Sequence, residues 1–254
     1  MLPGGWALLF VTLRRNTKTR ILLASGFLLA IVFVRFGIGV ITGEIPVAGR
    51  LQPLRRVTTS LPMVALTFDI SWGENVPTPV LDILKAEGVH STFFISGPWA
   101  STHQDIVRRI VSDKHELASH GWKHVNYSQL SREDIRTNIF QAHETLQQIT
   151  GISPHLIRTP NGDYSDTVIE VATELGYTVV EWSLDSLDWK KPGVDTIVSR
   201  VVDRAKPGDI ILMHASDTAA QTPDALPAII SGLRAKGLQL VTVGELLSAS
   251  SAPH

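Results

Sequence analysis

The chain has 254 residues, a formal net charge of −1 and no cysteine. The near-neutral charge argues against a nucleic-acid-binding protein, which normally carries a basic face, and the absence of cysteine excludes disulfides, thiolate metal sites and cysteine nucleophiles. A chain of this length holds one large domain, with or without an appendage, and any metal ion must be bound by His, Asp or Glu.

The first element along the chain is the apolar run "ILLASGFLLAIVFVRFGIGVI" at residues 21–41. As a helix it would be roughly 31 Å long, which matches the hydrocarbon thickness of a bilayer. Arg35 interrupts the run close to its end, where a long side chain can snorkel to the interface. We therefore predict a cytoplasmic stub and transmembrane anchor over residues 1–42. A cleaved signal peptide is one alternative, but its apolar region is usually shorter, and a buried helix of a soluble protein is the other.

Basic residues stand on both sides of this run: Arg14, Arg15, Lys18 and Arg20 before it, and Arg50, Arg55 and Arg56 after it. The positive-inside rule therefore favours an internal amino terminus only slightly. With that orientation the rest of the chain lies outside the cytoplasm and is attached to the membrane.

Residues 43–60 contain Gly, Pro and charge without periodicity, which is typical of a linker, and the globular domain is expected over residues 61–250. In this domain short β-rich runs alternate with amphipathic stretches. The predicted strands fall within residues 63–68, 91–96, 115–119, 155–158, 177–183, 209–214 and 238–243. Strands that alternate with helices in this way indicate a parallel sheet, either doubly wound or closed into a (β/α) barrel.

Two of the helix predictions are supported by signals at both ends. Residues 131–151 open with Ser131 three residues before Asp134, close to a capping box, and stop at Gly151. Residues 165–176 likewise begin at a serine and end at a glycine.

Ionisable residues follow the predicted strands at the points where the strands end. They are Asp69, His120, Arg158, Asp185, Asp188 and His214. Taken singly, each has a structural explanation, such as a turn aspartate or a packed histidine. Because the carboxyl ends of parallel strands converge on one face, their common placement predicts a functional site at that rim. No role is assigned to five other histidines, His90, His103, His115, His143 and His155.

The sequence "HGWKH" contains a pair of candidate metal ligands, His120 and His124. Their four-residue spacing lets two imidazoles approach one ion, although this pattern alone is a weak signal. Catalytic zinc normally has three protein ligands and an open position for water. A carboxylate is therefore expected to complete the set.

Five short motifs occur along the chain: "TFDIS", "SHGWKH", "RTPNG", "DSLDW" and "LMH". In order and approximate spacing they resemble the motifs of polysaccharide deacetylases, carbohydrate esterase family 4 with the NodB homology domain. The resemblance covers about residues 61–248. "FDISWGE" and "ISGPW" further resemble the PdaB-like branch found in spore-forming bacteria, and sporulation is suggested by that resemblance alone.

The resemblance implies a distorted (β/α) barrel of about seven parallel strands. It also implies removal of acetyl groups from N-acetylglucosamine or N-acetylmuramic acid units with a divalent metal, zinc in the first place and cobalt or nickel otherwise. Asp69 matches the catalytic base of the family, and Arg158 matches the arginine that holds this base. His120 and His124 match the two metal-binding histidines.

The remaining motif residues match the acid side of the reaction and the walls of the groove. His214 corresponds to the general acid that protonates the departing amine, and Asp188 to the acid that orients it. Asn161 follows the motif proline, so its backbone N–H corresponds to the donor for the oxyanion. Trp189 corresponds to a wall of the substrate groove.

Three positions depart from the family pattern. The family usually has a second aspartate as third metal ligand, where this chain has Ile70, which cannot coordinate a metal. Either Glu74 swings in, or Asp69 binds the metal itself, or the site is two histidines and water; weak metal binding is expected. Gly121 replaces the usual Ser or Thr, and Asn161 the usual Tyr or Phe.

These observations lead to one functional hypothesis and one alternative. The hypothesis is a membrane-anchored, metal-dependent deacetylase that acts outside the cytoplasm on a cell-wall glycan such as peptidoglycan. The alternative is a glycan-binding pseudoenzyme with the same groove. Retention of the base and the acid, Asp69 and His214, favours the enzyme, whereas Ile70 favours the binder.

Overall fold

The structure, a computed structural model, describes residues 51–250. The predicted membrane anchor at residues 21–41 lies outside these residues. Among the helices between residues 51 and 250, none combines the length and the apolar character needed to cross a membrane.

Strands and helices alternate along the described chain, as the sequence predicts. The strands are β1 (Met63–Ile70), β2 (Thr92–Ile95), β3 (Glu116–Ser119), β4 (Leu156–Ile157), β5 (Thr178–Val179), β6 (Leu184–Asp185), β7 (Ile210–His214) and β8 (Gln239–Val241). The α-helices are α2 (Pro77–Ala86), α3 (Gly97–Thr102), α4 (Gln104–Ser112), α5 (Arg132–Thr150), α6 (Asp166–Glu174), α7 (Val194–Val202), α8 (Thr222–Ala235) and α9 (Val243–Ser250).

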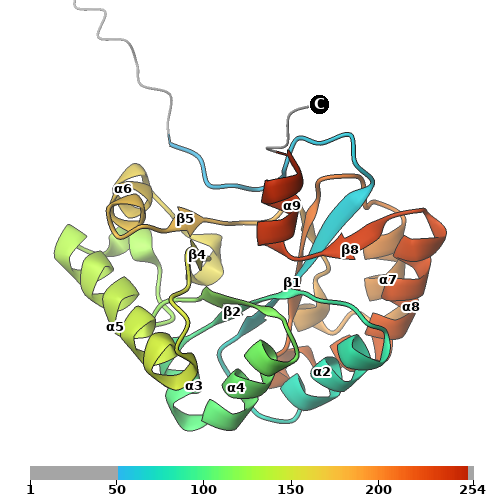
Figure 1. Cartoon of the computed structure of the whole chain (residues 1–254), viewed down its shortest axis with the longest axis horizontal. Helices are drawn as coiled ribbons and strands as arrows, with labels where there is room; N and C mark the ends of the chain where they lie inside the picture. The colour runs from blue at the N-terminus through green and yellow to red at the C-terminus, as the bar shows by residue number, and fades with distance from the viewer. Residues whose placement is uncertain (1–50, 251–254) are drawn as a thin grey trace, which may run out of the picture. The chain divides into compact units, whose positions relative to one another are not determined.

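The strands form one sheet in the order β5-β4-β3-β2-β1-β7-β6, and β8 pairs with the first part of β1. All of these strand pairs are parallel. The sheet curls into a half-barrel around the central strand β1, with most helices along its outer side (Figure 1). The predicted α/β class and parallel sheet are therefore confirmed, but the barrel is open, with β5 and β6 at its two ends.

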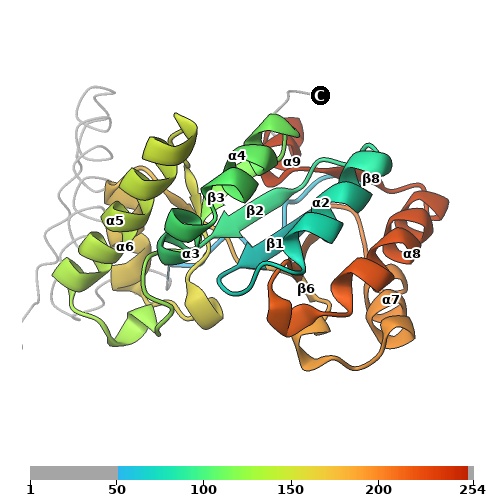
Figure 2. The ribbon, with the colours of Figure 1, turned by 90° about the horizontal axis from the view of Figure 1, so that it is seen from below.

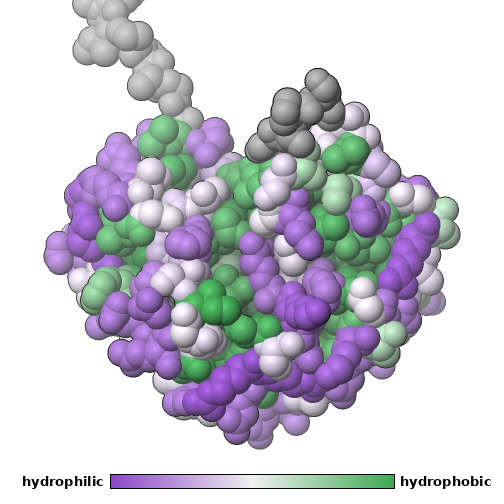
Figure 3. Space-filling model, in the orientation of Figure 1, coloured by the Kyte–Doolittle hydropathy of each residue, from purple (hydrophilic) through white to green (hydrophobic). Residues whose placement is uncertain are grey.

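Figure 2 shows the helices at the two ends of the sheet, with α5 beside α6 at one end and α7 beside α8 at the other. Hydrophilic side chains gather along the outer margin of the face in Figure 3, whereas hydrophobic ones lie towards its middle. The helices thus present their polar faces to solvent and their apolar faces to the sheet.

Alternation along β1 decides which side chains face the interior of the half-barrel. Leu66, Phe68 and Ile70 are fully buried in the hydrophobic cluster that joins the sheet to α2, α4, α7 and α8. Ala65 packs in a second cluster with Phe94, on the other face of the strand. Since successive side chains of a strand point to opposite faces, Asp69 faces the interior and Ile70 faces the outer helices.

The helix-end signals in the sequence are confirmed. Ser131 caps α5, because its hydroxyl accepts a hydrogen bond from the Asp134 N–H at 3.1 Å, and Gly151 ends this helix in the left-handed conformation. Ser165 caps α6 in the same way through the N–H of Val168.

Residues 177–183 do not form one strand. The structure has the two-residue strands β5 and β6 on either side of a break at residues 180–183. In this break the carbonyl groups of Val180 and Glu181 accept hydrogen bonds from the Arg158 guanidinium. A buried side chain therefore takes acceptors that would otherwise pair with a neighbouring strand.

Part of the segment expected as a linker is built into the domain. Leu54 pairs with Val180 and Arg56 with Asp209 in isolated β-bridges. Val57 is 4 % exposed and packs in the interior cluster. Residues 51–57 thus belong to the folded domain, which begins before residue 61, where it was expected to begin.

Candidate active site

A cleft of about 460 Å³ opens at the carboxyl ends of the strands. Its lining includes seven of the residues that the sequence predicts at the rim or in the motifs, namely Asp69, His120, His124, Asn161, Asp185, Trp189 and His214. Arg158 and Asp188 are fully buried and contact the residues that line it. The histidines to which no role was assigned are absent from this lining. Residues far apart in the sequence thus meet at one end of the sheet.

Asp69 is fixed in the floor of the cleft by Arg158. Nη1 of Arg158 lies 2.7 Å from Oδ1 of Asp69 and 2.9 Å from the hydroxyl of Thr67. Thr67 precedes Asp69 by two residues and lies on the same face of β1. The guanidinium also lies 4.0 Å from the centre of the Phe94 ring, a cation–π contact. These contacts together leave Arg158 one orientation.

The charge state of Asp69 follows from this arrangement. Burial alone would raise the pKa of Asp69, but the positive charge of Arg158, with smaller effects of His120 and His214, brings it below its ordinary 3.8. Asp69 is therefore a carboxylate at neutral pH, with Oδ2 free of the guanidinium.

His120 and His124 lie beside this free oxygen. His120 Nε2 is 3.9 Å from Asp69 Oδ2, and the two imidazole rings have centroids 5.4 Å apart. His120 Nδ1 lies 2.8 Å from the Arg158 carbonyl; because a carbonyl only accepts, Nδ1 carries the proton and Nε2 has the lone pair. Burial lowers the pKa of His120 to about 4 and also lowers that of His124.

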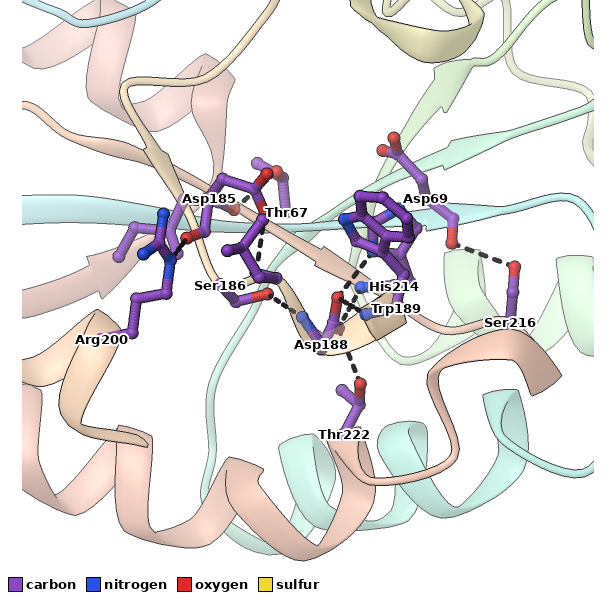
Figure 4. A network of polar contacts seen from close by, with 12 residues as sticks. Thr67, Asp69, Asp185, Ser186, Asp188, Trp189, Arg200, His214, Ser216 and Thr222 are labelled. Atoms are coloured by element: carbon purple, nitrogen blue, oxygen red, sulfur yellow. Dashed lines mark hydrogen bonds and ion pairs between the residues drawn. The ribbon is translucent and has the colours of Figure 1, made fainter. Parts of the chain in front are cut away.

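A second fixed pair, Asp188 and His214, lies next to Asp69 in the cleft (Figure 4), because Asp69 and His214 are register partners on the neighbouring strands β1 and β7. Asp188 Oδ1 accepts hydrogen bonds from His214 Nδ1 at 2.7 Å and from the Trp189 N–H at 2.8 Å. Its Oδ2 accepts from the His214 N–H and from the Thr222 hydroxyl, both at 2.7 Å. Asp188 thus has both oxygens occupied and holds the imidazole of His214 through Nδ1. The other ring nitrogen, Nε2, is not used in this contact.

The same contacts set the charge of His214. Burial would lower the pKa of His214, but the hydrogen bond and the negative charge of Asp188 outweigh it and raise the pKa above 6.5. The cleft therefore presents a carboxylate, Asp69, and an imidazole, His214, that keeps its proton to higher pH than a free histidine does. These are the two protonation states that general base and general acid catalysis need.

The side chains present supply two metal ligands rather than three. His120, with its tautomer fixed by a carbonyl, and His124 have the chemistry of metal ligands. Glu74, however, is 74 % exposed and lies 3.9 Å from His103, away from the cleft. Within residues 51–250, no set of three or more His, Asp or Glu side chains is arranged to bind a metal ion. Asp69 Oδ2 is thus the carboxylate oxygen next to the two imidazoles.

Gly121, between the two histidines, has a packing reason for lacking a side chain. Its φ is +72°, and a Cβ built there would lie 1.9 Å from the hydroxyl oxygen of Tyr127, which is fully buried. Tyr127 therefore fills the space beside the loop that the usual Ser or Thr would occupy.

Asn161 and Trp189 contribute to the two flanks of the cleft. Asn161 adopts a left-handed conformation with φ 61°, which asparagine tolerates better than other non-glycine residues. The hydrogen bonds of its 3₁₀ turn come from Gly162 and Asp163, so the Asn161 N–H is left out of the turn. Trp189 is 47 % exposed, with the Lys190 ammonium 5.0 Å from its ring centre.

Several residues of the site were missed in the sequence. They are Thr67, Trp72, Glu181, Trp182 and Thr222, which line the cleft or bind its buried groups. Thr67 alone had a usable signal, since it precedes Asp69 by two residues on a buried strand and so shares its face. Thr222 lies 34 residues beyond Asp188, a separation that no motif spans.

Comparison with known proteins gives consistent matches. A family model described as polysaccharide deacetylase matches residues 56–180. A peptidoglycan-N-acetylglucosamine deacetylase of Bacillus cereus is 34 % identical over 204 residues, 78 % of this chain and 95 % of the relative. The protein YlxY of Bacillus subtilis is 31 % identical over 77 % of this chain, which spans 60 % of that relative.

Among solved structures, BA3943 of Bacillus anthracis, described as a CE4 family pseudoenzyme, is 29 % identical with a TM-score of 0.74. The match covers 78 % of this chain and 69 % of BA3943. A mutant of BA3943 described as having restored enzymatic activity matches with the same TM-score. Fold, cleft and sequence agree, and the chain belongs to the polysaccharide deacetylase family, carbohydrate esterase family 4.

Proposed function

We propose that this chain is a metal-dependent deacetylase that acts on N-acetylglucosamine or N-acetylmuramic acid units of a cell-wall glycan such as peptidoglycan. The observation that carries the proposal is the presence of a base and an acid on neighbouring strands at one cleft, each held by its own buried partner. Arg158 holds Asp69, and Asp188 holds His214. A protein that only binds glycan needs neither pair.

The proposed chemistry assigns one role to each pair. Asp69, ionised and with Oδ2 facing the imidazoles, takes a proton from the attacking water. His214, whose pKa is raised by Asp188, gives a proton to the departing amine, which otherwise is a poor leaving group. The Asn161 N–H, left out of its turn, is the proposed donor to the oxyanion.

His120 and His124 are the proposed ligands of a divalent ion, zinc or else cobalt or nickel. When bound, such an ion supplies Lewis-acid activation of the water, whose pKa it lowers from 15.7 towards about 7. We expect weak binding, because Ile70 faces the outer helices and adds no ligand to the two imidazoles. Of the two carboxylates considered as substitutes, Asp69 is near the histidines and Glu74 is not.

The finer assignments rest on the sequence. Placement in the PdaB-like branch rests on "FDISWGE" and "ISGPW", and a role in sporulation rests on that placement. Attachment to a membrane, with the deacetylase domain outside the cytoplasm, rests on the apolar run at residues 21–41.

Variants of the base and the acid test the proposal. Asp69→Asn and His214→Ala should each abolish acetate release from N-acetylglucosamine oligomers, with circular dichroism confirming a folded chain. Thr218→Ala, which also changes a residue that lines the cleft, should keep most of the activity. Full activity in both Asp69→Asn and His214→Ala would rule out the proposed roles.

The second candidate is a glycan-binding pseudoenzyme, and two observations favour it. Ile70 stands where the family has a ligand, and the related BA3943 is described as a pseudoenzyme. On this account the chain binds the same oligomers but releases no acetate with any metal. Binding measured beside acetate release therefore separates the two candidates.

A further inference from the structure

The loop at residues 71–76, between β1 and α2, carries an aromatic side chain into the cleft. Trp72 lines the cleft together with Asp69 and His124. It is 49 % exposed, although its indole is large and apolar. Its ring centre lies 4.5 Å from that of His124. Half of an apolar ring thus faces solvent directly beside the groups that would perform the reaction.

This loop is held in one conformation by residues from two other parts of the chain. The carboxylate of Asp217 accepts hydrogen bonds from the N–H groups of Glu74, Asn75 and Val76 at 3.3, 2.9 and 3.0 Å. The Asp217 N–H in turn donates to the Trp72 carbonyl at 3.1 Å. These bonds span more than 140 residues of sequence, so they fix the loop to the end of β7.

Close packing at Gly73 adds to this. The indole N–H of Trp99 donates to the Gly73 carbonyl at 2.6 Å. Gly73 has φ +76°, and a Cβ there would lie 2.0 Å from Cγ of Asp217. A loop fixed this firmly presents Trp72 without an ordering cost when a ligand binds.

Trp72 and Trp189 belong to opposite sides of the cleft. Trp72 contacts His124, which follows β3, whereas Trp189 follows β6 and lies beside His214 (Figure 4). Trp72 itself follows β1, and in the sheet β1 and β6 are separated by β7. Two half-exposed indoles therefore flank the space that the reacting group must enter.

Flat apolar rings on both sides of a cleft suit a ligand that has apolar faces and polar edges. A pyranose ring has this shape, because its axial C–H groups form faces and its hydroxyl groups form the edge, and aromatic faces attract such C–H groups. Exposed apolar groups beside polar, pKa-shifted residues are typical of ligand sites. Packing within the domain does not explain why half of the Trp72 side chain is exposed to solvent.

We propose that Trp72 is a substrate-binding residue that packs against the sugar unit next to the one that is deacetylated, so that the glycan lies between Trp72 and Trp189. This inference rests on the proposed function. It makes the substrate an oligomer of at least two pyranose units. Trp72 then contributes binding free energy only to ligands that have a second sugar unit, and not to a monosaccharide.

Calorimetric binding to the full chain tests this, in the presence of chelator so that no turnover accompanies binding. The probes are the N-acetylglucosamine tetramer and the monomer. Trp72→Ala should weaken tetramer binding about tenfold or more, as loss of an aromatic anchor does, and leave monomer binding unchanged. Trp72→Phe should recover most of the affinity. Phe140→Ala is the control, since Phe140 is 54 % exposed on α5 and does not line the cleft.

A role of Trp72 through His124 alone predicts a different result. In that case Trp72→Ala lowers the affinity for zinc and leaves tetramer binding in chelator unchanged, and the inference is overturned. The wild-type chain separates this failure from that of the proposed function. If it binds the tetramer but Trp72→Ala binds equally well, only the inference fails. If the wild-type chain binds no oligomer and releases no acetate, both fail.

Discussion

Arg158 and Asp69 form a buried ion pair, with Nη1 2.7 Å from Oδ1 and the arginine fully excluded from solvent. The pair lies under the cleft, and the other contacts of the guanidinium are to Thr67, Phe94 and two main-chain carbonyls. The arginine therefore links the end of β4 to the end of β1 and to the break after β5. Its removal should affect both the stability and the charge of the site.

Arg158→Met should lower the free energy of unfolding by about 3–5 kcal/mol at pH 7, because it leaves an uncompensated carboxylate in the interior. The folded-state pKa of Asp69 is depressed, so its stabilisation is present above pH 3.8 and is lost as the pH falls through the lower folded value. The difference between wild type and variant should therefore shrink at acid pH. Urea denaturation at pH 7 and pH 3 measures both.

A double variant is the control for this prediction. Arg158→Met with Asp69→Asn has no buried charge at the pair, so it should be more stable than the sum of the two single losses indicates. Strictly additive losses would show that the pair is not coupled.

Asp188→Asn should move the basic limb of the activity profile to lower pH. The hydrogen bond and charge of Asp188 raise the pKa of His214, so the acid form is lost as the pH rises through a value above 6.5. Without the carboxylate, that loss occurs at lower pH. Imidazole titration by NMR follows the same change independently of activity.

Thr222→Val is the matched control, since it removes one hydrogen bond to Asp188 and keeps the charge. It should shift the titration of His214 less than Asp188→Asn does. A titration of His214 that is the same in Asp188→Asn and wild type would contradict the assigned cause.

Gly121→Ala should destabilise the fold more than Gly237→Ala does. Both glycines have positive φ, +72° and +75°, and a left-handed alanine costs about 1 kcal/mol in either place. A Cβ at Gly121 also meets the Tyr127 hydroxyl, whereas Gly237 has nothing within 4 Å. Overpacking should add about 1–3 kcal/mol at Gly121. Equal losses in thermal or urea unfolding would contradict the close contact.

Glu181→Gln should stabilise the protein at alkaline pH and not at pH 4. The Glu181 carboxyl is 1 % exposed, and burial raises its pKa from 4.5 to about 7. Because the folded state favours the protonated acid, stability falls as the pH rises from 4.5 through about 7, by roughly 3 kcal/mol. Glutamine does not ionise and avoids this loss. Urea denaturation across this range should show the two curves diverging, and parallel curves would contradict the shift.

The sequence could predict those site residues that lie at the carboxyl ends of recognisable strands. Asp69, His120, Arg158 and His214 stand at or directly after strands that are long or apolar enough to recognise, and parallel strands bring their carboxyl ends together. The helix caps at Ser131 and Ser165 are local signals, and both predictions are confirmed.

Other parts of the fold could not be predicted because their cause lies far along the chain. The two-residue strand β6 is too short for periodicity, and the break before it depends on acceptors taken by Arg158. The exposed Trp72 is fixed by Asp217, 145 positions later in the printed sequence. The burial of Ile70 depends on which face of β1 meets the helices.

Acetate release from N-acetylglucosamine oligomers by the full chain, assayed first in chelator and then with rising zinc, cobalt or nickel, tests the central claim most directly. We predict no acetate in chelator and release that appears with added metal, at concentrations high enough to load two imidazoles. Asp69→Asn should remain inactive at every concentration. Release that is unaffected by chelator, or no release with any of these metals, would contradict a metal-dependent deacetylase built on Asp69, His120, His124 and His214.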